Sequence, residues 1–179
     1  NPNTPTGSVY PRHILQQIVD VAREHELVVF TDEIYEKIIY DGAEAINLAT
    51  LTGDDVLCLT FSGLSKAYRV CGYRAGWVAI TGPKHEAANY IEGITLLASM
   101  RLCSNVPAQH AIQTALGGYQ SIDALVAPGG RLHEQRDVAY RMLNEIDGIS
   151  CNQSDGALYL FPKVDTEKFN IVDDEKFML

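Results

Sequence analysis

The chain has 179 residues, 46 % of them hydrophobic, which is enough for one domain of ordinary size with a sizeable core. It carries 23 acidic and 14 basic residues, a net charge of −9, and no basic block, which argues against nucleic acid and acidic membrane surfaces as partners. We find no signal peptide and no apolar run of membrane-spanning length, and we expect a cytoplasmic protein.

The first half of the chain alternates helical and apolar segments, which is typical of an α/β fold. Pro11 begins a helix with apolar residues at helical spacing. The run 27–31 is continuously apolar and predicts a strand buried on both faces of a parallel sheet. Two more strands are predicted at 56–61 and 73–81. We therefore expect a three-layer α/β/α sandwich of mostly parallel strands.

The second half changes from helices to short strands. The predicted elements are helices at 83–101, 108–116 and 131–146, followed by strands at 149–151 and 157–161. The long helix 83–101 carries apolar residues on one face, which includes Ile91 and Leu97. We assign residues 1–130 to a large domain, and residues 131–179 to an inter-domain helix and the start of a small α+β domain.

The two ends of the sequence predict an internal fragment of a longer protein. The chain opens in a Pro- and Gly-rich turn without an initiator methionine and ends on an apolar tripeptide after a charged run. Cysteines and histidines are scattered without metal-ligand spacing, so no metal site is expected.

Lys66 is the first candidate for chemistry. It follows a predicted buried strand in a turn of small residues, and ligands in open α/β sheets gather at the carboxyl ends of strands. A desolvated lysine amine forms Schiff bases readily, whereas a lone lysine is more often a surface residue. Arg74, eight residues later, is a natural phosphate clamp, with a simple salt bridge as the alternative.

Asp32 and Tyr35 are the second pair of candidates. Asp32 ends the first predicted strand, where a helix cap is the simpler interpretation, and Tyr35 alone would be half-buried packing. Together, a carboxylate that holds a proton on a heterocyclic nitrogen and a phenol that donates to an oxyanion suit pyridoxal phosphate, which also needs a lysine and a phosphate clamp.

Four motifs in this order resemble the fold-type I, class I/II aminotransferases. They are Asn-Pro-Asn-Thr-Pro-Thr-Gly at 1–7, Phe-Thr-Asp-Glu-Ile-Tyr at 30–35, Ser-Gly-Leu-Ser-Lys at 62–66 and Gly-Tyr-Arg-Ala-Gly-Trp at 72–77. The likeness continues through 90–93, 100–109 and Gly-Ala-Leu-Tyr at 156–159, and the middle section is similar to the bacterial glutamate–pyruvate (alanine) transaminases in particular.

The resemblance implies a role for each candidate residue. Lys66 would form the internal aldimine with pyridoxal 5′-phosphate and carry the proton during transfer. Asp32 would pair with the pyridine nitrogen, and Tyr35 would hydrogen-bond the ring's phenolic oxygen. Arg74 would bind the phosphate, with Ser65 or Ser62 as helpers.

Two positions depart from the family's pattern. The family has Asn directly before Pro-Thr-Gly, where it touches the ring oxygen and the substrate carboxylate. This chain has Thr4 there, with Asn3 one residue earlier. A phosphate-binding serine often lies three residues before the lysine, and here that position is Gly63, whose backbone N–H can serve instead.

The function implied is transamination between an amino acid, with alanine expected, and a 2-oxo acid such as 2-oxoglutarate or pyruvate, by a homodimer when full length. The family's C-terminal arginine and other pocket residues lie outside the chain, so the fragment alone is expected to be inactive. Two alternatives stay open: a β-eliminating C–S lyase of the same fold, and a non-catalytic pyridoxal-phosphate-binding or regulatory domain, which Thr4 favours.

Overall fold

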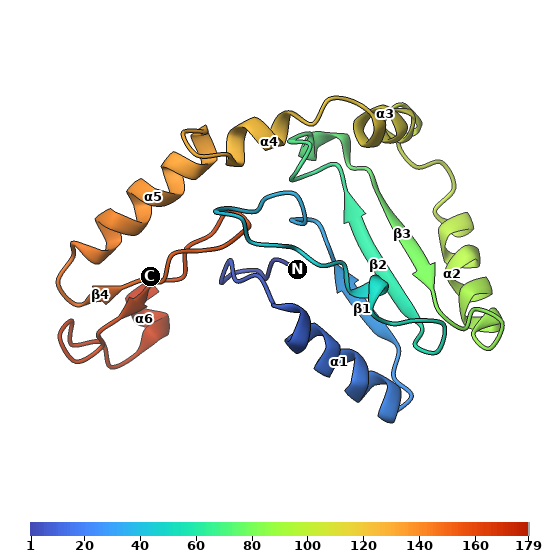
Figure 1. Ribbon diagram of the computed structural model, residues 1–179, viewed down its shortest axis with the longest axis horizontal. Coiled ribbons are helices and arrows are strands. Elements are labelled where there is room, and N and C mark those ends of the chain that lie inside the picture. Colours follow the sequence, from blue (N-terminus) through green and yellow to red (C-terminus); the bar gives the residue numbers. More distant parts are fainter. Residues whose placement is uncertain (179) are drawn as a thin grey trace.

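The computed structural model describes residues 1–178, and its helices trace an arch around a central sheet (Figure 1). The helices are α1 (Arg12–Glu24), α2 (Ala88–Met100), α3 (Val106–Gly117), α4 (Ser121–Val126), α5 (Arg131–Asn144) and α6 (Asp174–Met178), with 3₁₀ turns η1 (Leu48–Thr50) and η2 (Cys71–Tyr73). The helices predicted from Pro11, at 108–116 and at 131–146 are confirmed, with ends shifted by a few residues. No helix among the described residues is long and apolar enough to cross a membrane.

The central sheet has the order β1–β2–β3, formed by β1 (Val29–Asp32), β2 (Cys58–Gly63) and β3 (Gly76–Thr81). β1 and β2 are parallel, whereas β2 and β3 are antiparallel. The α/β class is confirmed, but this sheet is mixed rather than mostly parallel. The connection after β2, residues 64–75, holds only the 3₁₀ turn η2 and no crossover helix, whereas parallel neighbours are usually joined by a crossover that contains an α-helix.

The third strand starts at Gly76 and not at Tyr73 as predicted. Residues 71–73 form η2, and Arg74 then takes a left-handed conformation with φ 51°. Both features interrupt extended backbone, so strand pairing begins only after them.

One face of β1 is buried and the other is exposed, so the prediction of a strand buried on both faces is wrong. Val29 and Thr31 are buried, while Phe30 is 59 % exposed. The buried face packs with α1 and the 46–58 region in one hydrophobic cluster (Leu15, Val19, Ala22, Val29, Ile46, Leu48, Val56 and Cys58). The packing of this cluster sets the orientation of β1 and therefore the direction of its last residue, Asp32.

Helix α2 is shorter than predicted, and it is exposed. It begins at Ala88 after a run of turns, and none of its residues is buried. Leu97 is 69 % exposed and Met100 is 77 % exposed. The apolar residues of α2 are therefore left uncovered by the rest of the described chain.

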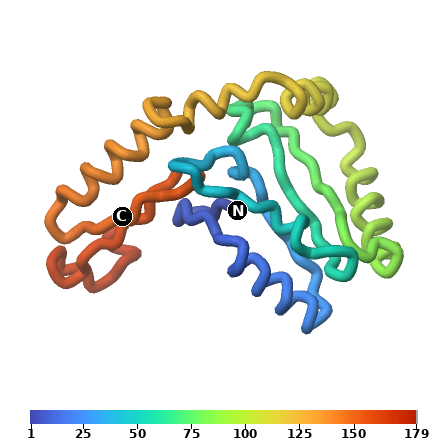
Figure 2. Tube along the Cα trace, viewed as in Figure 1, coloured from blue at the N-terminus to red at the C-terminus, as the bar shows by residue number. Residues whose placement is uncertain are grey.

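The C-terminal part contains a second, two-stranded sheet of β4 (Ile149–Ser150) and β5 (Lys163–Val164). The strand predicted at 157–161 is wrong. Instead, Gly156 forms an isolated bridge with Ile39, and Ala157 has φ 61°, which ends any strand. Figure 2 shows this segment (orange) against the 38–41 loop (cyan), although the two lie far apart in the sequence.

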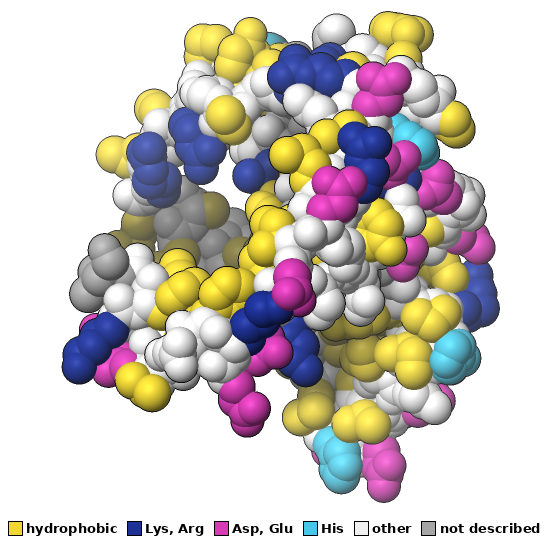
Figure 3. Space-filling view, turned by 90° about the vertical axis from the view of Figure 1, so that its left-hand side faces the viewer, with side chains coloured by type: hydrophobic (Ala, Val, Ile, Leu, Met, Phe, Trp, Pro, Cys, Tyr) yellow, Lys and Arg dark blue, Asp and Glu magenta, His cyan; other side chains and the backbone are white. Residues whose placement is uncertain are grey.

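The end of the molecule that carries α5 and α6 presents a mixed surface. Figure 3 looks onto it and shows hydrophobic side chains interspersed with charged ones. Exposed hydrophobic residues of this part of the chain include Val138, Met142, Phe161 and Phe169. The division into residues 1–130 and 131–179 stays a prediction.

Candidate functional site

The carboxyl ends of β1 and β2 form the edge of the sheet where the candidate site lies. The two strands pair in parallel with Asp32 opposite Phe61, so Asp32 ends β1 beside the point where β2 leads into the Ser62–Lys66 turn. Ligand sites of open α/β sheets lie at this kind of edge. Lys66 and Ser65 are both half-buried in this turn.

Two glycines allow β2 and β3 to come close at this edge. Gly63 pairs with Gly76, and a Cβ atom on Gly76 would lie 2.7 Å from the Ser62 carbonyl oxygen. The Leu64 amide then donates to the Ala75 carbonyl at 3.0 Å. This bond places Arg74 next to the turn that carries Ser65 and Lys66.

Tyr35 connects the two strand ends. It lies three residues after β1 and its side chain is only 3 % exposed. The Lys66 Nζ atom lies 5.7 Å from the centroid of its ring. The Tyr35 hydroxyl is hydrogen-bonded to the Tyr159 hydroxyl, and burial, then this bond, raises the pKa of Tyr35 above its ordinary value. Tyr35 therefore keeps its proton, and either of the two hydroxyls can be the donor in this bond.

Asp32 is exposed and has a carboxylate with one local bond. Its Oδ1 atom accepts from the Ile34 amide at 3.0 Å, and its backbone carbonyl accepts from the Asn1 nitrogen at 2.9 Å. The strand end is therefore held by the N-terminal turn, while the carboxylate keeps free acceptor capacity for a ligand.

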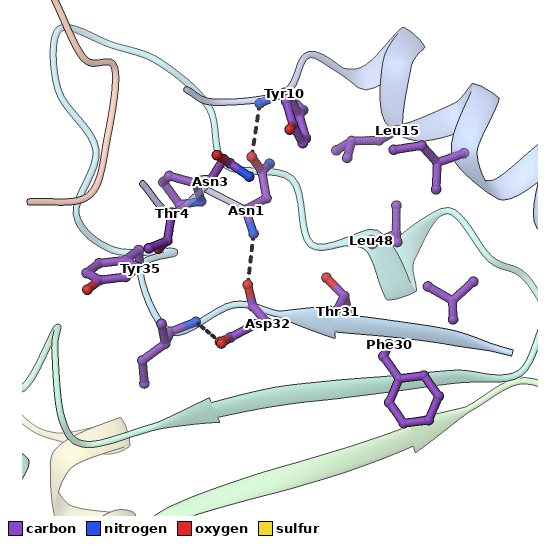
Figure 4. Close-up of a pocket in the computed structure, with 14 residues that line it drawn as sticks. Asn1, Asn3, Thr4, Tyr10, Leu15, Phe30, Thr31, Asp32, Tyr35 and Leu48 are labelled. Atoms are coloured by element: carbon purple, nitrogen blue, oxygen red, sulfur yellow. Dashed lines mark hydrogen bonds between the residues drawn. The ribbon is translucent and has the colours of Figure 1, made fainter. Parts of the chain in front are cut away.

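A pocket of about 440 Å³ opens beside Asp32, a size typical of small-molecule sites. Figure 4 shows Asn3, Thr4 and Tyr35 gathered around one part of it, with Leu15, Leu48 and Phe30 around the other. Lys66, Arg74, Ser62 and Ser65 do not line this pocket. Lys66 is linked to it only through its contact with Tyr35.

The N-terminal turn brings Asn3 and Thr4 to the pocket in different ways. The Asn3 side-chain oxygen accepts from the Thr6 hydroxyl at 2.7 Å, and its backbone carbonyl accepts from the Gly7 amide at 2.9 Å. Asn3 is thus occupied in closing the turn. Thr4 is exposed, and its side chain has no hydrogen bond within residues 1–178.

Arg74 is exposed, and its Nη1 atom donates to the Cys71 carbonyl at 2.8 Å. The sequence left a salt bridge open as the alternative role of Arg74, but the structure shows this hydrogen bond to the residue's own loop instead. The other guanidinium donors of Arg74 remain exposed at the sheet edge. Ser62 is half-buried at the end of β2, opposite Trp77.

Two residues of this region were not singled out from the sequence. Glu33 is buried, with Oε1 accepting from the Thr31 hydroxyl at 2.8 Å and from the Leu48 amide at 3.3 Å. Tyr159 reaches Tyr35 from the C-terminal part of the chain. The Gly-Ala-Leu-Tyr motif contains Tyr159 and could have indicated a role for it. The acidic pair Asp32-Glu33 gives no sign in the sequence of which carboxylate is buried.

The comparisons with known proteins decide the family. The sequence profile of the family Aminotransferase class I and II matches residues 1–178. The chain belongs to this aminotransferase family. It is 64 % identical to an alanine aminotransferase of Mycobacterium tuberculosis over all of its length and 42 % of that protein. It is 59 % identical to the glutamate-pyruvate aminotransferase AlaA of Escherichia coli, again over its whole length and 44 % of that protein.

Solved aminotransferase structures have the same fold. A crystal structure of an aminotransferase from Escherichia coli superposes with a TM-score of 0.96, at 59 % identity, over 99 % of this chain and 44 % of that chain. An alanine aminotransferase from Pyrococcus furiosus gives 0.83, at 39 % identity, over 92 % and 41 %. The chain thus spans well under half the length of these relatives, and its similarity to them covers all three strands of the sheet.

The residues present fit pyridoxal phosphate in their chemistry. Asp32 at the end of β1, Tyr35 just after it, Lys66 in the turn after β2 and Arg74 before β3 supply a carboxylate, a phenol, an amine and a guanidinium, and of these Lys66 Nζ lies 5.7 Å from the centroid of the Tyr35 ring. The Tyr35 phenol is buried and protonated, as a donor to a ring oxygen must be. Among residues 1–178 there is no group of His, Cys, Asp and Glu side chains that could hold a metal ion.

Proposed function

We propose that the protein to which this chain belongs is a pyridoxal-phosphate-dependent aminotransferase acting on alanine. The amino group would pass between alanine and a 2-oxo acid, with 2-oxoglutarate as the acceptor and pyruvate as the 2-oxo acid formed from alanine. The observation that carries the proposal is the approach of Lys66 Nζ to the Tyr35 ring, at 5.7 Å, beside the strand end that carries Asp32. The names of the relatives, alanine aminotransferase and glutamate-pyruvate aminotransferase, support the substrate class.

Each residue has one task in this proposal. When bound, pyridoxal phosphate supplies an aldehyde that takes up the amino group and a ring that accepts electrons. Lys66 Nζ would hold the cofactor through its aldehyde, and the amine, released when the substrate's amino group takes its place, would move the proton at the substrate's α-carbon. Asp32 would keep a proton on the ring nitrogen, because a nearby carboxylate stabilises the charged form of a base.

The remaining residues hold the cofactor in place. The Tyr35 hydroxyl would donate to the ring oxygen, and Arg74 would bind the phosphate with Ser65 or Ser62. Asn3 and Thr4 line the pocket beside them. Part of the proposal is that the active unit is a cytoplasmic homodimer with domains divided near residue 130, and that the 179-residue chain alone is inactive.

The test uses the full-length protein and the variant Lys66→Ala. We expect the unaltered protein to show the visible absorbance of covalently bound cofactor and to form pyruvate and glutamate from alanine and 2-oxoglutarate. Lys66→Ala should lose both. Lys37→Ala is the matched control, because Lys37 is also half-buried but lies outside the site.

Three results would count against this function. Visible absorbance that persists in Lys66→Ala removes Lys66 from the proposed role. Pyruvate release without a 2-oxo acid acceptor indicates the C–S lyase instead. Cofactor binding without turnover of any amino acid indicates the regulatory domain, which the exposed Thr4 favours.

A further inference from the structure

The segment 154–159 is docked tightly against the first forty residues of the chain. The Ala157 amide donates to the Ile38 carbonyl at 2.9 Å, and the Gly156 amide donates to the Gly7 carbonyl at 2.9 Å. The Tyr40 hydroxyl donates to the Ala157 carbonyl, also at 2.9 Å. Ala157 is completely buried in a cluster with Tyr35, Ile38, Tyr40 and Ile122. These contacts fix where the next side chains of the segment point.

The docking leaves no room for adjustment near Tyr159. A Cβ atom on Gly156 would lie 2.5 Å from Pro2 Cγ, and one on Gly7 would lie 2.5 Å from Ser154 Cβ. A Cβ atom on Gly7 would also lie 2.9 Å from the Gly156 carbonyl oxygen, so the N-terminal turn and the 154–159 segment pack closely at both glycines. Tyr159 follows this contact by three residues and is half-buried over Tyr35.

The two tyrosines meet in a defined geometry. Their ring centroids are 5.5 Å apart at an interplanar angle of 76°, an edge-to-face contact, and their hydroxyls are hydrogen-bonded. The groups around Tyr35 are Lys66 over its ring, Asp32 at the end of β1 and Tyr159 at its hydroxyl. Tyr159 is the hydroxyl that contacts the Tyr35 oxygen directly.

Proton counting sets the direction of this hydrogen bond once a ligand is present. Each phenol has one proton to donate and an oxygen that can accept. If Tyr35 donates to a ring oxygen, its own proton is used, so the bond between the tyrosines requires Tyr159 as the donor. Hydrogen bonds in such a chain polarise one another, which makes Tyr35 a stronger donor than it would be alone.

We propose that Tyr159 is a positioning residue for the cofactor, whose hydroxyl donates to Tyr35 and so orients and strengthens the Tyr35 hydrogen bond to the ring oxygen. This inference rests on the proposed function. It assigns to the C-terminal segment a role in the chemistry of a site whose other members lie in residues 1–77. Tyr159 acts through Tyr35 and not on the reacting atoms.

The experiment is a double-mutant cycle in the full-length protein with pyridoxal phosphate bound. Tyr159→Phe, Tyr35→Phe and the double variant are compared by the pH midpoint of the cofactor's visible absorbance and by the rate of cofactor loss. Negative charge on the ring oxygen helps to hold the proton on the cofactor-bound nitrogen, and a hydrogen-bond donor to that oxygen reduces this charge. Loss of the donor therefore moves the pH midpoint upward. We expect Tyr159→Phe to raise it by about 0.3 to 1 pH unit and to speed cofactor loss about twofold to tenfold.

The cycle separates positioning from packing. Tyr35→Phe should give a larger shift in the same direction, and adding Tyr159→Phe to it should move the midpoint no further. Tyr40→Phe is the matched control, because it also removes a hydroxyl that holds the 154–159 segment, but this hydroxyl donates to the Ala157 carbonyl and not to Tyr35. It should lower the unfolding temperature and leave the midpoint unchanged.

The outcomes distinguish this inference from the proposed function. The role of Tyr159 is overturned, and the proposed function is not, if Tyr159→Phe leaves the midpoint unchanged. The same holds if Tyr159→Phe shifts the midpoint equally in the unaltered protein and in Tyr35→Phe. A full-length protein that binds no pyridoxal phosphate overturns the proposed function as well. A shift that disappears in the Tyr35→Phe background supports the inference.

Discussion

The candidate site is built from two regions that are held together differently. At the sheet edge, Asp32 and the Lys66 turn are placed by neighbouring strands that end at the same level. At the docked segment, residues 154–159 are placed by contacts with the N-terminal turn and the 38–41 loop, without belonging to any sheet ladder beyond one bridge. The sheet edge carries the charged candidate residues Asp32 and Lys66. The docked segment packs its backbone against the start of the chain and contributes the Tyr159 hydroxyl.

The difference concerns what each region can tolerate. The Asp32 carboxylate makes a single local bond, to Ile34, so its charge can change without disturbing the packing. Gly156 and Ala157 are buried against backbone and ring atoms, so any added atom displaces something. Substitutions at the sheet edge should therefore reduce activity at nearly constant stability, and those at the docked segment should reduce stability first.

The largest effect is expected at the sheet edge, from Asp32→Asn in the full-length protein. The amide keeps the shape of the carboxylate but loses the charge that holds a proton on the ring nitrogen. We expect kcat for alanine to fall about 100-fold to 1000-fold, the range seen when one electrostatic stabiliser is removed. The unfolding temperature should stay within experimental error.

The control for this variant is Asp54→Asn, an exposed aspartate away from the site. It should leave kcat unchanged. An Asp32→Asn protein that loses stability together with activity would contradict the separation between the two regions.

Gly156→Ala in the docked segment should give the next largest effect, now on stability. The new methyl group meets Pro2 Cγ at 2.5 Å and the Ile38 carbonyl oxygen at 3.0 Å, and neither is the end of a flexible side chain. Overpacking of this kind costs about 1 to 3 kcal/mol of unfolding free energy. Chemical denaturation of the full-length protein measures it.

Gly93→Ala is the matched control for Gly156→Ala. A Cβ atom at Gly93, on α2, meets nothing within 4 Å in the described part of the chain. Alanine favours a helix over glycine, so this change should not lower the unfolding free energy. Equal losses in both variants would show that the close contact at Gly156 is not what matters.

The sheet edge could be predicted from the sequence because its causes are local. An apolar run ends in Asp32, another ends before Lys66, and parallel strands bring their carboxyl ends together. The path of β3 was predicted less well, because the left-handed Arg74 that delays it has no marker in the sequence. The burial of Glu33 depends on Thr31 and Leu48, which come from two different elements.

The docked segment could not be predicted because its causes are distant. The run 157–161 predicted a strand, but the Gly156 amide donates to the Gly7 carbonyl and the Ala157 amide donates to the Ile38 carbonyl, and pairing with the 38–41 loop is limited to one bridge. The partner strand of β4 is instead β5. The exposure of helix α2 could not be predicted for a related reason. Periodicity shows that a helix has an apolar face but not whether the described chain covers it.

The smallest effect is a pH dependence of the docked segment. Arg136 on α5 is buried, and it binds the Asp41 carboxylate and the Ser154 carbonyl, next to the docked residues. The hydrogen bond from Arg136, then that from His133, lowers the pKa of Asp41. A carboxyl whose pKa is lower in the folded state stabilises the fold above its unfolded pKa of about 3.9 and loses that contribution as the pH falls through the folded value.

We therefore expect the unfolding free energy of the full-length protein to fall as the pH drops below about 4, with Asp41 contributing less than about 1 kcal/mol because its carboxylate is half exposed. Asp41→Asn should flatten the profile in this window, and Arg136→Met should do the same by removing the main cause of the low pKa. An unchanged slope in both variants would show that Asp41 does not link the docked segment to pH.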